Sequence, residues 1–221
     1  MRPAGSARAS RCSNRECESL VALGQARDDG QARLSVELYL ARHGETEWSL
    51  NGRHTGKTDL PLTPQGEEKA ADLSGRLQKI QFDAVFSSPL QRARRTAELA
   101  GFPKPQLTAL LREVDYGEYE GMTSKAIRES RPDWELYRDG SPGGETQAQI
   151  YARAMDFIHL ASASGSRVLA FSHGHFLRAV AIAWMKLDVT AASNLDLDVA
   201  TLSLLRDDHR GRLLAMWNSP P

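Results

Sequence analysis

Short apolar runs alternate with longer amphipathic segments along most of the chain. The run at 36–41 (VELYLA) is brief and almost wholly apolar, a pattern typical of a buried strand. By contrast, 145–161 places Ile150, Phe157 and Ile158 on one face at helical spacing, which predicts an amphipathic helix. These patterns predict strands at 36–41, 83–86, 106–109, 167–171, 200–205 and 213–217, and helices at 63–79, 89–100, 123–130, 145–161 and 175–185.

Cap and turn residues mark where several of these elements begin and end. Thr63 and Pro64 suit the N-cap and the first position of a helix. The segment 139–144 (DGSPGG) is a clear break, and a turn at 207–211 joins the last two strands as a hairpin. Because strands alternate with longer helices, we predict an α/β fold, a three-layer α/β/α sandwich with a largely parallel central sheet.

The first 33 residues differ from the rest because they have no apolar period. Their one apolar patch, 20–23, is shorter than the core of a secretory signal, which needs about 7 residues or more. The first 15 residues hold four arginines and no acid, a composition that resembles an organelle transit peptide. An over-long gene start is a further alternative. We predict that 1–33 is a disordered N-terminal extension and that 34–221 is the folded domain.

Composition and charge exclude some classes of protein without selecting a function. The chain has 221 residues, of which 41% are hydrophobic and 25% charged, as expected for one globular domain. Lys and Arg number 28, as do Asp and Glu, so the basic excess of a nucleic-acid-binding protein is missing. No apolar run reaches the length of about 18 residues that a transmembrane helix needs. We therefore expect neither a nucleic-acid partner nor a membrane partner.

Both cysteines, Cys12 and Cys17, lie in the first 20 residues. A secreted protein held together by disulfides would spread several cysteines through the chain. We therefore expect a reducing compartment, the cytoplasm, and no metal site built on thiolates.

Chemically active residues follow three of the predicted strands. The segment 42–46 (RHGET) follows the first strand, 87–93 (SSPLQRA) the second, and 172–175 (SHGH) the strand at 167–171. Ligands of such sheets bind at the carboxyl ends of strands, so these segments are expected to meet. Arginine offers a planar fork of donors to phosphate oxygens, and a neutral imidazole can accept a phosphoryl group on nitrogen. The strand ends therefore predict a phosphate-handling site.

With these segments, the sequence resembles the histidine phosphatase superfamily, also called phosphoglycerate-mutase-like. Four blocks carry the resemblance in the family's order: 42–46 (RHGET), 88–96 (SPLQRARRT), 111–121 (LREVDYGEYEG) and 171–179 (FSHGHFLRA). The match covers about 36–217, so the folded domain is expected to be a histidine phosphatase domain. Four blocks in order are far more specific than the Arg-His-Gly-Glu motif alone.

The resemblance implies a catalytic role for five residues. His43 would be the nucleophile and become phosphohistidine. Arg42, Arg92 and His173 would hold the phosphoryl oxygens and stabilise charge in the transition state. Glu113 would protonate the leaving oxygen and later activate water. No metal and no other cofactor is implied, because cationic and hydrogen-bonding side chains take the place of a metal.

Three further residues are candidate phosphate or substrate contacts. Thr55 stands where the family often places such a contact. Ser49 departs from the family, many members of which have Asn after the Trp of this loop, here Trp48. His175 resembles members that include acid phosphatases and a sedoheptulose-bisphosphatase-like branch. The spacing of His173 and His175 also allows metal ligation, but no carboxylate or Cys lies at typical ligand spacing.

We predict a metal-independent phosphomonoesterase that acts on small phosphorylated metabolites, sugar phosphates among them, through a phosphohistidine. A cofactor-dependent phosphoglycerate mutase is the first alternative. The mutases that this chain resembles usually have a long insertion after the third block and Arg where Val114 stands, so the sequence favours a phosphatase. The second alternative, a non-catalytic phospholigand-binding regulator, is disfavoured because His43 and Glu113 are present. The expected partner is a small phosphorylated substrate, and the sequence allows a homodimer.

The predicted acid–base roles imply an acidic to neutral pH optimum. His43 must be neutral to attack, while Glu113 must be protonated to donate. Both needs are met at one pH only if the pocket shifts one of the two pKa values.

Overall fold

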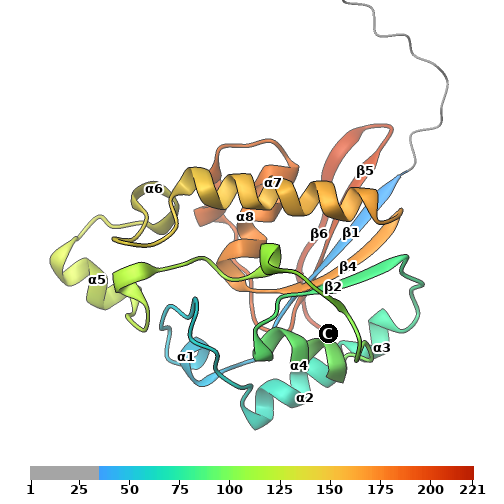
Figure 1. Cartoon of the computed structure of the whole chain (residues 1–221), viewed down its shortest axis with the longest axis horizontal. Coiled ribbons are helices and arrows are strands. Elements are labelled where there is room, and N and C mark those ends of the chain that lie inside the picture. The colour runs from blue at the N-terminus through green and yellow to red at the C-terminus, as the bar shows by residue number, and fades with distance from the viewer. Residues whose placement is uncertain (1–34) are drawn as a thin grey trace, which may run out of the picture. The chain divides into compact units, whose positions relative to one another are not determined.

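A computed structural model describes residues 35–221, and the predicted extension at 1–33 lies outside the described residues. The domain is built on a six-stranded sheet with the strand order β3-β2-β4-β1-β5-β6 (Figure 1). The first four strands in this order run parallel, and β5 is antiparallel to both of its neighbours. The strands are β1 (Val36–Arg42), β2 (Ala84–Ser87), β3 (Gln106–Leu107), β4 (Arg167–Ser172), β5 (Leu202–Asp208) and β6 (Gly211–Ser219).

Helices cover both faces of this sheet, with α7 and α8 on one side and α2, α3 and α4 on the other (Figure 1). Three 3-10 turns, at Ala109–Leu111, Gly117–Tyr119 and Val189–Asn194, lie in the connecting segments. The α-helices are α1 (Glu47–Leu50), α2 (Pro64–Asp72), α3 (Ser74–Leu77), α4 (Gln91–Leu99), α5 (Ser124–Ser130), α6 (Leu136–Asp139), α7 (Gln147–Ala163) and α8 (Gly174–Trp184).

The alternation of side chains along the strands builds the three layers. In β1, Leu38 and Leu40 belong to the apolar cluster that contains the buried faces of α7 and α8. Ala41, the residue after Leu40, belongs instead to the cluster of α2, α3 and α4, together with Leu169 and Phe171 of β4. Successive side chains of a strand point to opposite faces, so each strand contributes to both cores. The predicted three-layer α/β/α sandwich is confirmed.

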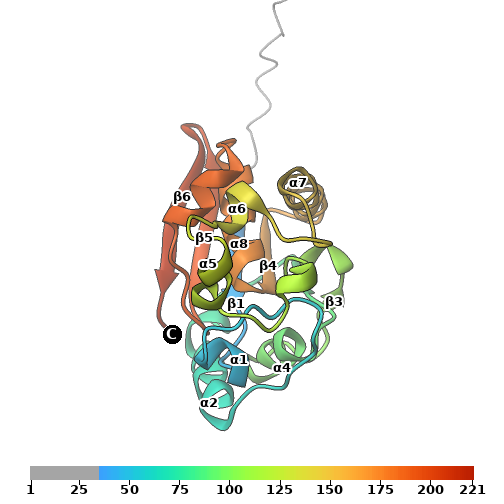
Figure 2. The same cartoon turned by 90° about the vertical axis from the view of Figure 1, so that its left-hand side faces the viewer.

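A third apolar cluster lies under α5 and α6 and includes Tyr116, Trp134 and Tyr137. Figure 2 shows α1, α5 and α6 gathered at one end of the domain. Among the described residues, none of the helices combines the length and the apolar character needed to cross a membrane.

Two predicted elements differ from the structure. The helix expected at 63–79 begins as predicted, with the Thr63 side chain accepting the N–H of Gly66, but it ends at Asp72. A second helix, α3, begins at Ser74. The segment divides here because Ser74 and Gly75, in its middle, are poor helix formers.

The strand expected at 106–109 stops at Leu107. The side chain of Thr108 accepts the N–H of Leu110 and caps a 3-10 turn there, so the backbone leaves the sheet. The short helices α1 and α6 were not predicted. Their four-residue lengths carry no helical period, and they depend on caps by Thr46 and Glu135.

Candidate active site

The ends of β1, β2 and β4 bring three predicted segments together at one edge of the sheet. Backbone hydrogen bonds continue past the strands, from the N–H of His43 to the carbonyl of Ser172 (2.9 Å) and from Ser88 to Phe171 (2.9 Å). The rings of His43 and His173 consequently lie with their centroids 5.1 Å apart. Because these strands are parallel neighbours, their carboxyl ends must meet.

His43 is held in the form that a nucleophile requires. Its Nδ1 lies 2.7 Å from the carbonyl oxygen of Gly44, so Nδ1 carries the proton and Nε2 carries the lone pair. Burial, followed by the nearby charges of Arg92 and Arg42, lowers the pKa of His43 well below its usual value. The ring is therefore neutral at neutral pH.

Arg92 is fully buried and orients His173. Its Nε donates to Nδ1 of His173 (3.1 Å), its Nη1 donates to the carbonyl of Thr58 (2.9 Å), and its Nη2 donates to two further backbone carbonyls (3.0 Å). His173 must then carry its proton on Nε2, which lies 2.8 Å from Oγ of Ser88. Burial lowers the pKa of His173 well below its usual value, and the nearby charge of Arg92 lowers it further. The guanidinium charge of Arg92 is held by neutral carbonyl groups.

Arg42 lies beside the start of α8. Its Nη1 donates to the carbonyl of Leu197, and its Nε is buried without a hydrogen-bond acceptor. A Cβ at Gly174 would lie 3.2 Å from both Cζ and Nε of Arg42, so any other residue there would displace Arg42 slightly. Burial lowers the pKa of Arg42, and Glu113 partly offsets that effect.

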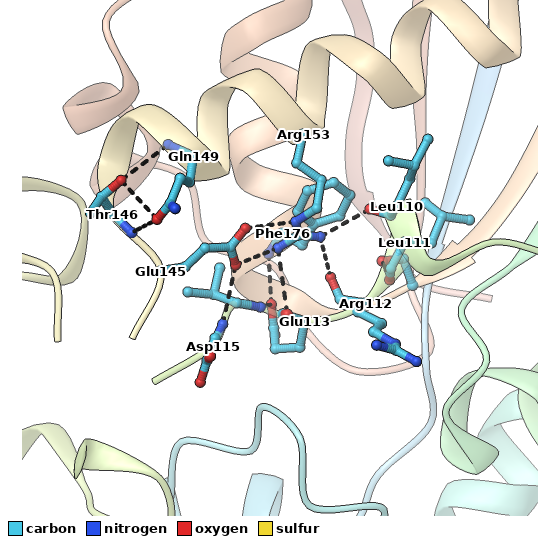
Figure 3. Close-up of polar contacts among 12 residues, drawn as sticks. Leu110, Leu111, Arg112, Glu113, Asp115, Glu145, Thr146, Gln149, Arg153 and Phe176 are labelled. Carbon is cyan, nitrogen blue, oxygen red and sulfur yellow. Dashed lines mark hydrogen bonds and ion pairs between the residues drawn. The ribbon is translucent and has the colours of Figure 1, made fainter. Parts of the chain in front are cut away.

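Glu113 is fixed by the first turn of α8. Its carboxylate accepts the N–H groups of Phe176 (2.8 Å) and His175 (3.1 Å), together with that of Val114 (2.9 Å) (Figure 3). The positive end of a helix favours a carboxylate at this place. The same helix therefore positions Glu113 and packs against Arg42.

An ion pair from α7 holds the loop that carries this carboxylate. Arg153 binds Glu145 at 2.7 Å and also donates to the carbonyl of Arg112 at 2.7 Å (Figure 3). Glu145 in turn accepts the N–H of Asp115 (3.2 Å). The Arg153 guanidinium lies 3.9 Å from the ring centroid of Phe176. Contacts on both sides of residue 113 thus fix the loop.

A cavity of about 300 Å³ opens at this edge. Three of the predicted catalytic residues line it: Arg42, His43 and Glu113. Arg92 and His173 are fully buried next to His43 and are not part of the cavity wall.

The predicted contacts Ser49 and Thr55 also line this cavity. The Ser49 hydroxyl is engaged with Thr46, accepting its N–H at 2.8 Å and donating to its carbonyl at 2.9 Å, so it caps α1. The Thr55 hydroxyl donates to the carbonyl of Arg53 (3.2 Å). Both hydroxyls therefore have local partners at the cavity wall.

His175, the third predicted contact, lines the cavity with residues that were not predicted. Its Nδ1 lies 2.6 Å from the hydroxyl of Tyr116. His54 stacks on Tyr116 with ring centroids 4.7 Å apart, and burial lowers the pKa of His54 to about 4. Burial also lowers the pKa of His175 well below its usual value. Arg178 lines the cavity as well.

Only one of these additional residues left a signal in the sequence. Arg178 follows His175 by three positions, so a helix starting near 174 places both on one face. His54 lies in a loop without periodicity and could not have been found. Among residues 35–221, no group of three or more His, Cys, Asp or Glu side chains is placed to hold a metal ion.

Comparisons with known proteins point to one family. The sequence model described as histidine phosphatase superfamily (branch 1) matches residues 38–220. An acid phosphatase of Mycobacterium tuberculosis is 43% identical over 184 residues, which cover 81% of this chain and 90% of that protein. A sedoheptulose 1,7-bisphosphatase of Saccharomyces cerevisiae is 35% identical over 189 residues, which cover 71% of this chain and 70% of that protein. The solved structure of an open-reading-frame product of Mycobacterium tuberculosis has a TM-score of 0.80 at 41% identity, covering 84% of this chain and 98% of that one.

Proposed function

Because the chain belongs to branch 1 of the histidine phosphatase superfamily and is a phosphatase, we propose that it hydrolyses small phosphomonoesters through a phosphohistidine formed on His43. The observation that carries this proposal is the state of His43, neutral and with Nε2 unprotonated, beside the buried Arg92 and the cavity-lining Arg42. Sugar phosphates are the proposed substrate class, which the name of the yeast relative supports.

In the first step, Nε2 of His43 attacks phosphorus and the bond from phosphorus to the ester oxygen breaks. Glu113 gives its proton to that oxygen, and the alcohol leaves. Arg42, Arg92 and His173 stabilise the charge on the three transferred oxygens. The phosphoryl group is then bonded to Nε2 of His43, while the proton stays on Nδ1 and remains hydrogen-bonded to the Gly44 carbonyl.

In the second step, water attacks the phosphohistidine and Glu113 accepts the proton that the water loses. The bond between phosphorus and nitrogen breaks, its electron pair returns to Nε2, and phosphate leaves. Glu113 ends protonated, as it began. In this proposal the guanidinium groups supply the positive charge, so no metal is required.

The test is release of phosphate from p-nitrophenyl phosphate between pH 4 and 9, with and without EDTA. The wild type should hydrolyse the substrate at the same rate with and without EDTA. In His43→Ala, kcat should fall at least about 1,000-fold. A phosphoprotein that is stable in base and labile in acid should accumulate after rapid quenching of the wild type.

Persistent activity in His43→Ala, or loss of activity with EDTA, would contradict the proposal. Interconversion of 2- and 3-phosphoglycerate faster than hydrolysis would identify a mutase instead. Binding of phosphosugars without turnover would identify a regulator.

A further inference from the structure

The catalytic cavity continues past the phosphoryl-binding groups toward Arg178 in α8. A second cavity of about 200 Å³ adjoins it, and the two share His54, Ser124, His175 and Arg178 as wall residues. Arg178 lies three residues after His175, less than one helical turn, so its Cα is about 5 Å further along the helix. Because His43 and Arg178 both line the larger cavity, one small ligand in that cavity can contact both residues.

Arg178 has no counter-charge in the part of the chain that the structure describes. It forms no ion pair there, and its Nε is buried without a hydrogen-bond acceptor. Leaving a buried charged donor unpaired is costly, and proteins rarely keep such a group without a use for it. Arg178 thus differs from Arg153, whose guanidinium is paired with Glu145.

Two carboxylates line these cavities, and neither forms an ion pair with Arg178. Among the charged side chains of the larger cavity, Arg42, Arg53 and Arg178 are cationic and only Glu113 is anionic. In the smaller cavity, the Glu135 carboxylate already accepts the backbone N–H of Arg138 (2.9 Å). With Arg42 committed to the transferred phosphoryl group, the charge of Arg178 remains for another anion.

We infer that Arg178 forms a second anion-binding subsite, so that preferred substrates carry a phosphate ester at one end and a second phosphate or a carboxylate a few carbons away. This inference rests on the proposed function. Two cationic side chains in the wall of one cavity favour a ligand with two negative groups, because each group then meets its own partner.

Matched substrate pairs test this subsite. Fructose 1,6-bisphosphate and fructose 1-phosphate differ by a phosphate, while 3-phosphoglycerate and glycerol 3-phosphate differ by a carboxylate. The wild type should prefer the doubly anionic member of one pair by at least about 10-fold in kcat/KM. The pair that shows the preference identifies the second group.

In Arg178→Gln this preference should fall at least about 10-fold, and Arg178→Lys should keep part of it. Arg94→Gln is the matched control, because Arg94 is exposed and lies outside both cavities. Its preference should equal that of the wild type. Thermal melting of each variant shows that it is folded.

Equal rates on both members of both pairs by the wild type, or an unchanged preference in Arg178→Gln, would overturn the subsite while leaving the hydrolase intact. Calorimetric binding to His43→Ala separates the two ideas further. If the wild type hydrolyses nothing, but His43→Ala binds fructose 1,6-bisphosphate more tightly than fructose 1-phosphate and loses this preference in His43→Ala/Arg178→Gln, the subsite stands and the proposed function fails.

Discussion

At the scale of single residues, the site depends on how closely backbone and side chain approach one another. Gly174 leaves room for Arg42, whose Cζ and Nε would be 3.2 Å from a Cβ there. The space at Gly44 is smaller still, because a Cβ there would lie 2.4 Å from the carbonyl oxygen of Gly66. The first contact is with a side chain that can move, and the second is with backbone that cannot. Glycine after each histidine therefore serves a different purpose in the two motifs.

We predict that Gly174→Ala lowers kcat/KM by about 10-fold, because a displacement of Arg42 by a few tenths of an ångström misplaces its donors. The midpoint of urea unfolding should change little, since the guanidinium can shift. Gly75→Ala is the control: nothing lies within 4 Å of its Cβ, so activity should match the wild type. Full activity in Gly174→Ala would mean that the position of Arg42 tolerates this shift.

At the scale of elements, two helices together position one carboxylate. The first turn of α8 binds the carboxylate of Glu113 through two N–H groups. From α7, Arg153 binds the carbonyl groups of Leu110 and Arg112 in the same loop. Because Arg153 contacts backbone on the approach to Glu113, its loss would loosen the proposed general acid without touching substrate.

We predict that Arg153→Met lowers kcat for glycerol 3-phosphate by about 10- to 100-fold, with a smaller loss for p-nitrophenyl phosphate. An alkoxide needs a proton in order to leave, whereas p-nitrophenolate leaves readily without one. KM should change little. A general loss of structure would lower both rates equally, so the ratio of the two rates is the measurement.

Arg167→Met is the control for this variant. It removes a similar ion pair, between Arg167 and Glu37 at 2.9 Å, from the start of β4, whereas the site lies at the end of that strand. Its ratio of rates should equal that of the wild type. Breaking the mostly buried pair of Arg153 also destabilises the fold, so rates are compared below the melting temperature of each variant.

At the scale of the whole molecule, the buried site makes folding depend on pH. Burial lowers the pKa of His43, His173 and His175 well below the usual value, and that of His54 to about 4. The unfolded chain therefore binds more protons than the folded chain once the pH falls below about 6.5. Stability contributed by these neutral rings is complete above that pH and declines below it.

We predict that the free energy of unfolding in urea is lower at pH 5 than at pH 7.5. Each ring contributes a slope of up to about 1.4 kcal/mol per pH unit between the two pKa values. His54→Gln removes one titrating ring, so its slope between pH 6 and 5 should be smaller by up to that amount. A free energy that does not change with pH would contradict the lowered pKa values, because the rings would then bind protons equally in the folded and unfolded states.

The parts of the fold that follow from local pattern were predictable. Alternation along β1 placed Leu38 and Leu40 in one core and Ala41 in the other. The helix at 63–79 was predicted as one piece, but the structure divides it after Asp72. Leu73 and Leu77 are both buried, and the weak helix formers between them, Ser74 and Gly75, let the chain break.

By itself, the sequence determined the sandwich and the meeting of His43, Arg92 and His173, because strand direction carries the residues after each parallel strand to one edge. Only the tertiary structure decided the protonation state of His43, the pairing of Arg153 and the lack of a partner for Arg178. These properties depend on burial and on groups distant in the chain, such as Leu110 beside Arg153. Closeness in space sets a pKa or completes an ion pair, and no local pattern encodes it.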